Sequence, residues 1–235
     1  AYMKEGYAHI CREKNTTDNP AFYEALIQNY IYKGPVVEWY IRIKVKMERN
    51  YRLFNRLIPA PGQITDIGFG PLCYMLSLLS EDREILGIDY DEDKIALAQH
   101  GWLRNEYLQF RHGNALEYPL PESDVFILND MLHYMSYEHQ RTLLLKCADR
   151  LRSQGMIIIR DGNSANTSKH RLTRFTELLS TRIFNFNRTT GELYFTTETQ
   201  LREIAVTCGM NVEIIPNDKY TSNTIYIFRK PNEHE

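Results

Sequence analysis

The chain has 235 residues, of which 43% are hydrophobic and 25% are charged, and its formal net charge at pH 7 is −2. This length and apolar content fit one α/β domain with added elements, or two small domains. The near-neutral charge argues against a general nucleic-acid binder, and no apolar run is long enough to cross a bilayer.

Cysteine usage and the first residues bear on the compartment. Residues 1–20 lack the apolar core of a signal peptide. The cysteines are far apart and form no CxxC pair, which favours reduced thiols over a disulfide or zinc framework. We therefore expect a cytoplasmic protein. The cysteines are Cys11, Cys73, Cys147 and Cys208.

The N-terminal quarter has helical character. A first helix is expected from Pro20, with Gly34 as a stop, and a second restarts at Pro35 and runs to Leu57 as one long helix. An apolar stripe at spacings of three and four predicts its packing face: Val36, Tyr40, Ile43, Met47, Tyr51 and Phe54. Basic residues fall on roughly the opposite face: Arg42, Lys46, Arg49 and Arg56. Residues 1–62 are expected to form a helical extension or lid.

From Gln63 the pattern changes to short apolar runs that alternate with helix-length segments. Near-continuous Ile, Leu and Val runs are typical of strands buried on both faces. Alternation with helices predicts a parallel sheet with helices on both sides. The expected strands are "ITDIG" near residues 64–68, then 84–89, 107–110, 124–130 and 155–161.

The C-terminal part differs from this alternation. A helix is predicted from a capping box at Thr197 and Gln200 to a stop at Gly209. Two apolar runs, "NVEIIP" and "NTIYIFRK", then follow too closely for a crossover helix, so one of them must run antiparallel. The expected fold is α/β: a doubly wound, Rossmann-like, seven-stranded, mostly parallel sheet with an antiparallel closing strand, plus N-terminal helices.

The turn after the first strand indicates a cofactor site. Open α/β sheets bind ligands at the carboxyl ends of their strands, where strand order reverses. Gly68 and Gly70 in this turn allow a ligand to approach the backbone closely. Asp89 ends the second strand, where a carboxylate accepts hydrogen bonds from both ribose hydroxyls. A nucleoside-containing cofactor is therefore expected.

The spacing of the turn bears on which cofactor. A dinucleotide fingerprint, GxGxxG, would place a third glycine where Cys73 stands, which weakens a pyrophosphate site. S-adenosylmethionine has no phosphate, and Asp66 at the strand end suits its ammonium group. A nucleotide-dependent oxidoreductase stays as the alternative enzyme, and a cofactor- or partner-binding domain without catalysis as the alternative of another class.

Residues 63–230 resemble a class I S-adenosylmethionine-dependent methyltransferase. The stretches that carry the resemblance are "ITDIGFG", "ILGIDYDEDKIALA", "RHGNALEYPLPESDVFILNDMLHYM" and "LRSQGMIIIRD". Leu72 stands where the family's third glycine is usual. The resemblance implies methyl transfer to a small-molecule acceptor and a methyltransferase domain over residues 63–235.

The resemblance also implies residue roles. Gly68 and Gly70 would lie under the methionine end of the cofactor, with Asp66 beside them. The remaining implied cofactor contacts are Asp89 at the ribose, Tyr90 against the adenine, Asn114 and Ala115 at the adenine edge, and Asn129 near the sulfonium.

Three residues are candidates for chemistry at the acceptor. His133 follows the fourth strand and is expected to act as general base if the acceptor is a hydroxyl, the alternative being a structural histidine. Arg160 and Asp161 end the fifth strand, where Arg160 would hold a substrate carboxylate or form an ion pair. No metal is expected, although Asp130, Asp161 and Asn163 resemble the ligands of magnesium-dependent catechol methyltransferases.

A narrower resemblance links the chain to a pathway. "YKGPVVEWYIRIKVKMERNY" and "IIIRDGN" are similar to methyltransferase modules of bacteroidete bacteria that accompany aryl-polyene or flexirubin-type pigment pathways. It implies an acceptor that is aromatic or bound to a carrier, and an acyl carrier protein as a candidate partner for the basic face of the long helix. The alternatives for that face are a solvated surface without a partner and a docking surface for an anionic membrane.

Overall fold

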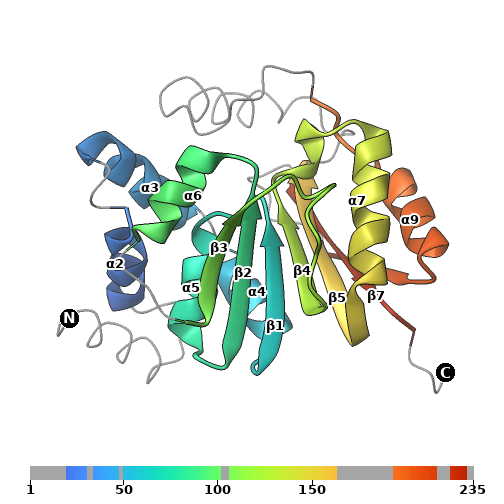
Figure 1. Ribbon diagram of the computed structural model, residues 1–235, viewed down its shortest axis with the longest axis horizontal. Helices are drawn as coiled ribbons and strands as arrows, with labels where there is room; N and C mark the ends of the chain where they lie inside the picture. The colour runs from blue at the N-terminus through green and yellow to red at the C-terminus, as the bar shows by residue number, and fades with distance from the viewer. Residues whose placement is uncertain are drawn as a thin grey trace.

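The computed structural model describes residues 20–30, 34–47, 50–101, 106–162, 193–215 and 223–231. Within them, seven strands form one sheet in the order β3-β2-β1-β4-β5-β7-β6, flanked by helices on both faces (Figure 1). The strands are β1 Gly62–Ile67, β2 Arg83–Asp89, β3 Leu108–His112, β4 Ser123–Asn129, β5 Leu151–Gly162, β6 Asn211–Ile215 and β7 Asn223–Arg229.

The direction of the strands confirms the expected fold class. Strands β1 to β5 pair in parallel, whereas β7 lies between β5 and β6 and is antiparallel to both. The parallel strands therefore end at one common edge. Strand order reverses between β1 and β4, and this reversal places the switch point of the sheet after β1.

Helices cover the two faces in separate groups. The bounds are α2 Pro20–Gln28, α3 Pro35–Met47, α4 Tyr51–Leu57, α5 Pro71–Leu79, α6 Glu92–Gln99, η2 Leu132–Tyr134, α7 Tyr137–Asp149 and α9 Glu198–Thr207. Helices α2 to α6 share one apolar core with the sheet, and α7 and α9 share the other (Figure 1). The side chains of Asp91, Ser136 and Thr197 cap α6, α7 and α9, and the capping box is present.

The long helix expected over residues 35–57 is wrong in one respect, because two helices occupy that stretch. Helix α3 ends at Met47, and α4 begins at Tyr51 after Asn50. Among the described side chains of α3, Ile41 and Val45 are buried, whereas Ile43 is 38% exposed. The break lets each helix turn its own apolar residues inward, Ile41 and Val45 in α3 and Tyr51 and Phe54 in α4. Asn50 itself makes no side-chain capping hydrogen bond.

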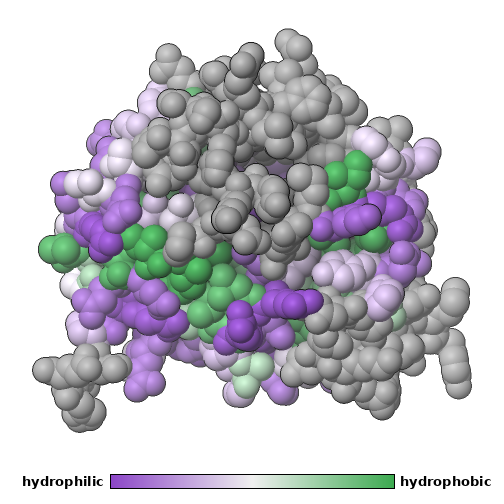
Figure 2. Space-filling model, turned by 180° about the vertical axis from the view of Figure 1, so that it is seen from behind, coloured by the Kyte–Doolittle hydropathy of each residue, from purple (hydrophilic) through white to green (hydrophobic). Residues whose placement is uncertain are grey.

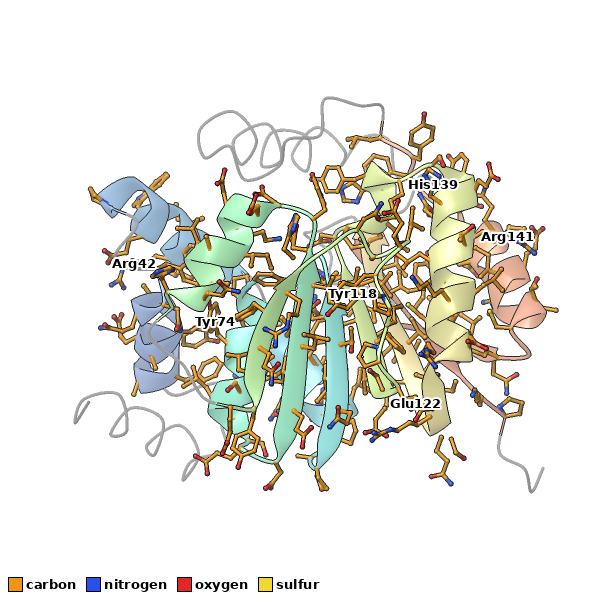
Figure 3. The ribbon with its side chains drawn as sticks, in the orientation of Figure 1. Arg42, Tyr74, Tyr118, Glu122, His139 and Arg141 are labelled. Atoms are coloured by element: carbon orange, nitrogen blue, oxygen red, sulfur yellow. The ribbon has the colours of Figure 1, made fainter. Side chains whose placement is uncertain are left out.

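The basic face of the same stretch is only partly as expected. The guanidinium of Arg42 pairs with Glu24 at 2.9 Å and with Glu38 at 2.9 Å. Figure 3 shows Arg42 beside α2 and α3, on the flank opposite α7. Lys46 and Arg56 are exposed, and Arg49 lies outside the described residues. The charge of Arg42 is therefore compensated within the helices themselves.

The helices before the sheet pack directly on the first helix inside it. Tyr30 meets Tyr74 of α5 edge to face, with 5.8 Å between ring centroids. Arg83, at the start of β2, donates to the carbonyls of Ile58 at 2.9 Å and Pro59 at 3.2 Å.

Seen from behind, the described surface carries a band of apolar residues between hydrophilic ones (Figure 2).

Strand β5 begins four residues earlier than the expected run at 155. Leu151 already pairs with Ser123 of β4, and the register then shifts before Val125. Gln154 has a φ of 63° at this irregularity. The apolar run alone indicates the regular part of the strand, because residues 152–154, which separate Leu151 from that run, are polar and lie at the register shift.

Candidate active site

The expected site residues gather at the carboxyl edge of the parallel strands. Asp66 is the penultimate residue of β1, and Asp89, Asn129 and Asp161 lie at or next to the ends of β2, β4 and β5. The edge includes the switch point between β1 and β4. This is where open α/β sheets bind their ligands.

The two glycines of the turn after β1 have different constraints. Gly68 has a φ of 71°, and an added Cβ would lie 2.9 Å from the Cβ of Met131. Gly70 has a φ of −138°, which any residue adopts, and an added Cβ would meet nothing among the described residues within 4 Å. The backbone at Gly70 therefore carries no strain that would require a glycine. The position opens onto free space, as a ligand approaching the backbone requires.

Phe69, between these glycines, points into the core. It is 3% exposed, and its ring centroid lies 4.6 Å from that of Phe110 in β3. A Cβ on Gly87 would come within 2.8 Å of Phe110 and 3.0 Å of Phe69. The absence of a side chain at residue 87 leaves room for both rings, and their packing anchors the turn.

Asp66 is a buried carboxyl group with an unsatisfied oxygen. Its Oδ2 accepts a hydrogen bond from the thiol of Cys73 at 3.2 Å, and Oδ1 has no partner among the described residues. Burial raises the pKa of Asp66 to about 7, although the Cys73 contact and the charge of Lys94 oppose the shift. A buried oxygen of this kind suits a cationic ligand group, because pairing offsets the cost of burying charge.

Asp89 is held in place by its own chain. Its Oδ1 accepts from the backbone N–H of Asp91 at 3.0 Å, and its Oδ2 pairs with the ammonium of Lys94. The Lys94 nitrogen also lies 5.0 Å from the centroid of the Phe69 ring. Sequence reasoning missed Lys94. Its position could have indicated this contact, because Lys94 lies in the first turn of α6, from which its side chain can return to Asp89 at the end of β2.

The residues expected at the adenine line the neighbouring loops. Tyr90 is 48% exposed, and its carbonyl accepts from His112 at 2.9 Å. The Asn114 side chain accepts from the N–H of Leu116 at 3.1 Å. Ala115 is buried. These positions border Asp89, since the N–H of residue 113 donates to the Asp89 carbonyl at 2.9 Å.

Arg160 and Asp130 form an ion pair between the ends of β4 and β5. One guanidinium nitrogen of Arg160 donates to Asp130 Oδ2 at 2.5 Å and to Asn129 Oδ1 at 3.2 Å. Asp130 has a φ of 53°, which is uncommon outside glycine. The ion pair thus helps to hold the left-handed turn that places Met131 over Gly68.

His133 and Asp161 form a second, buried pair at this edge. The backbone N–H of His133 donates to Asp161 Oδ2 at 3.1 Å, and its Nδ1 lies 2.5 Å from Asp161 Oδ1. The imidazole also stacks with Phe195, with 5.1 Å between ring centroids. Because a carboxylate only accepts, Nδ1 carries the hydrogen of this contact.

The described part of the chain holds no cluster of side chains that suits a magnesium ion. Asp161 faces His133 and Asp130 faces Arg160, and no group of three His, Cys, Asp or Glu residues suited to a metal occurs among the described residues. Asn163 lies outside them.

No helix in the described ranges has the length and apolarity to cross a membrane.

Comparison with known proteins finds similarity between the central region and methyltransferases. Residues 64–155 match a methyltransferase domain. A probable S-adenosylmethionine-dependent methyltransferase from Mycolicibacterium smegmatis is 30% identical over 125 residues, which are 46% of this chain and 46% of that protein. The match spans less than half the length of that curated relative.

Solved structures share the fold over more of the chain than the methyltransferase domain covers. Human N-acetylserotonin methyltransferase, in complex with S-adenosylmethionine, aligns with a TM-score of 0.60 and 18% identity, covering 98% of this chain and 67% of that one. An O-methyltransferase family 2 protein from Planctomyces limnophilus, in complex with apigenin, aligns at 0.58 and 17%, covering 83% and 70%. At these identities the likeness shows the fold.

Together the domain match and the curated relative support the class I S-adenosylmethionine-dependent methyltransferase superfamily. S-adenosylmethionine is the cofactor they support. The described residues fit it, because Asp66 presents a buried unpaired oxygen for a cationic group and Gly70 opens onto free space. The bacteroidete pigment modules do not feature in these matches, so that narrower resemblance stays a hypothesis.

Proposed function

We propose that this protein transfers the methyl group of S-adenosylmethionine to a hydroxyl of a small-molecule acceptor, with His133 as general base. The observation that carries the proposal is the buried His133–Asp161 pair, whose nitrogen and oxygen lie 2.5 Å apart. It stands at the same sheet edge as Asp66 and Asp89, which supports a base near the proposed cofactor residues.

The cofactor would be held by three features of the chain. Asp66 would accept from its ammonium group, the backbone around Gly70 would lie against its amino-acid end, and Asp89 would accept from its ribose hydroxyls. When bound, the cofactor supplies an activated methyl group. Tyr90, Asn114 and Ala115 would border the adenine, and Asn129 the sulfonium.

His133 would act on the acceptor. In the tautomer fixed by Asp161, Nε2 has a lone pair that can take the proton of a bound hydroxyl. The Asp161 carboxylate then faces the imidazolium at Nδ1 and stabilises its positive charge. Methyl transfer is an in-line displacement, so the rest of the protein's contribution is to position the acceptor oxygen. Arg160, already paired with Asp130, would support the wall of the acceptor site.

The finer identity of the acceptor is also a proposal. The similar structure from Planctomyces limnophilus is named as an O-methyltransferase family 2 protein and was solved with apigenin, which supports an oxygen atom and an aromatic acceptor. The narrower sequence resemblance supports an acceptor carried by an acyl carrier protein. We propose further that the helical extension, residues 1–62, covers the site as a lid.

Two measurements test the proposal in sequence. Calorimetric titration with S-adenosylhomocysteine, NAD and NADP should show binding of the first alone. Release of S-adenosylhomocysteine from S-adenosylmethionine is then followed with a panel of phenols, catechols, flavonoids and carrier-bound aryl acids, with matched aniline and carboxylate analogues. Turnover confined to hydroxylated members supports oxygen methylation. Binding of NADP in place of S-adenosylhomocysteine would overturn the cofactor assignment and revive the oxidoreductase alternative.

A further inference from the structure

Gln140 is a buried polar residue of α7 that lies between two exposed residues in the sequence. Its side chain is 1% exposed in the first turn of α7. Figure 3 labels the flanking residues His139 and Arg141, both of which are exposed. Buried amide groups in folded proteins are nearly always hydrogen-bonded, so the partners of Gln140 indicate what it holds.

Those partners come from two separate segments. The amide nitrogen lies 3.0 Å from the carbonyl oxygen of Leu132, 2.9 Å from that of Met135 and 2.7 Å from that of Tyr194. The amide oxygen accepts from the hydroxyl of Thr196. Leu132 and Met135 bracket His133, and the other two residues belong to residues 193–197, which we call the strap.

The strap in turn contacts His133 directly. The backbone N–H of Tyr194 donates to the His133 carbonyl at 2.8 Å. The Phe195 ring stacks on the imidazole with an interplanar angle of 21°. His133 is thus held by Asp161 through its Nδ1 and by the strap through its backbone and its ring face. The side chain of Gln140 joins the strap to residues 132–135, which we call the histidine turn.

We infer that Gln140 is a positioning residue: by hydrogen bonding to both the strap and the histidine turn, it fixes the direction of the His133 imidazole. This inference rests on the proposed role of His133. One planar amide meets carbonyl groups on both segments, which an aliphatic side chain cannot do. Without the amide, three carbonyl groups lose a shared donor, and the strap keeps only its backbone hydrogen bond and its ring contact to His133. A displacement of the base by about 1 Å is enough to cost about a hundredfold in rate.

The test uses the full chain labelled with ¹⁵N-histidine. In the wild type, the Nδ1 proton of His133 should give a low-field, slowly exchanging resonance because Asp161 accepts it, assigned by its loss in His133→Gln. Gln140→Met keeps the side-chain length and removes the amide, and Gln140→Glu keeps the acceptor for Thr196 and removes the amide nitrogen. Gln109→Met, at an exposed glutamine of β3, is the matched control.

The inference predicts that both Gln140 variants lose or broaden the resonance under conditions where circular dichroism shows them folded. Affinity for S-adenosylhomocysteine should stay within about twofold of the wild-type value, and turnover with any identified acceptor should fall about 10- to 100-fold. Gln109→Met should leave the His133 resonance, the affinity for S-adenosylhomocysteine and the turnover unchanged. If Gln140→Met does not fold, Thr196→Val, which removes only the hydroxyl that orients the amide, should broaden the same resonance.

The outcomes separate this inference from the proposed function. A wild-type resonance retained in folded Gln140→Met and Gln140→Glu, or in Thr196→Val where those two do not fold, overturns the positioning role and leaves the role of His133 intact. A wild-type spectrum without the resonance overturns the geometry that the positioning role requires. Full turnover in His133→Gln overturns the role of the base, whatever the Gln140 variants show.

Discussion

Lys94 and Asp89 form an ion pair at the end of β2, with the lysine ammonium also resting over the ring of Phe69. The carboxylate that we propose to bind the ribose is therefore positioned before any ligand arrives. One of its oxygens is fixed by the backbone of residue 91 and the other by the lysine. Preorganisation of this kind lowers the ordering cost of ligand binding.

Replacing Asp89 with Ala should weaken binding of S-adenosylhomocysteine by about 1.5–3 kcal/mol, which is the usual value of hydrogen bonds to a charged group. Calorimetric titration at constant pH measures it. Asp124→Ala, which removes a partly exposed carboxylate near the start of β4, is the control. Wild-type affinity in a folded Asp89→Ala protein would exclude the ribose assignment.

The stability of the protein should depend on the ionisation of Asp66. Its pKa is raised to about 7 in the folded state, mainly by burial, against about 3.9 in the unfolded chain. Between these values the folded state holds a proton that the unfolded state has released, so the free energy of unfolding falls as pH rises from about 4 to 7. The full effect is on the order of 4 kcal/mol.

Asp66→Asn isolates this contribution, because the amide has nearly the same shape and no titrating proton. Urea unfolding at pH 5, 6, 7 and 8 should show a flatter stability profile for the variant and higher stability than the wild type at pH 8. Parallel profiles for the two proteins would place the folded-state pKa of Asp66 near its ordinary value.

Cofactor binding should be coupled to the same proton. A bound ammonium group favours the ionised form of Asp66, so binding below about pH 7 requires release of its proton. The affinity for S-adenosylhomocysteine should therefore rise from pH 6 to pH 8. Titrations at pH 6.5 in buffers of different ionisation enthalpy should report up to one proton released in the wild type and none in Asp66→Asn.

The two glycines of the cofactor turn should respond in opposite ways to a side chain. Gly70→Val should keep the thermal stability of the protein, since its added Cβ meets nothing within 4 Å, and should lose cofactor affinity because the side chain enters the ligand's space. Gly68→Ala should instead destabilise the fold, because its φ is 71° and Met131 is 2.9 Å away. Thermal unfolding and calorimetry, run on both variants, measure the two effects. Unchanged affinity in Gly70→Val would place the ligand elsewhere.

Once an acceptor is identified, His133→Gln should lower turnover by about a hundredfold or more, with little change in cofactor affinity. Asp161→Asn should also lower turnover, because the amide no longer stabilises the imidazolium and permits the other tautomer. Steady-state rates over a pH series, together with S-adenosylhomocysteine titration, distinguish the two variants. An unchanged rate in His133→Gln would point to an acceptor atom that needs no base.

Much of the sheet was predictable because its strands are long apolar runs buried on both faces. Asp66, Gly68 and Asp89 were also predictable, since each follows from the end of a strand. Lys94 and Gln140 were not, because their importance arises from which backbone groups the folded chain brings near them. The same limit applies to the break at Asn50, where tertiary packing overrides a helical pattern that is continuous in the sequence.

The shared packing of Phe69, Gly87 and Phe110 has a consequence for how this chain can change over time. A methyl group at residue 87 collides with both rings, so substitution there is accommodated only when one ring becomes smaller. Since Phe69 lies between the cofactor-turn glycines, that shrinkage would alter the anchoring of the turn itself. The three positions, on three different segments, are therefore expected to vary jointly in descendants of this sequence that keep the cofactor.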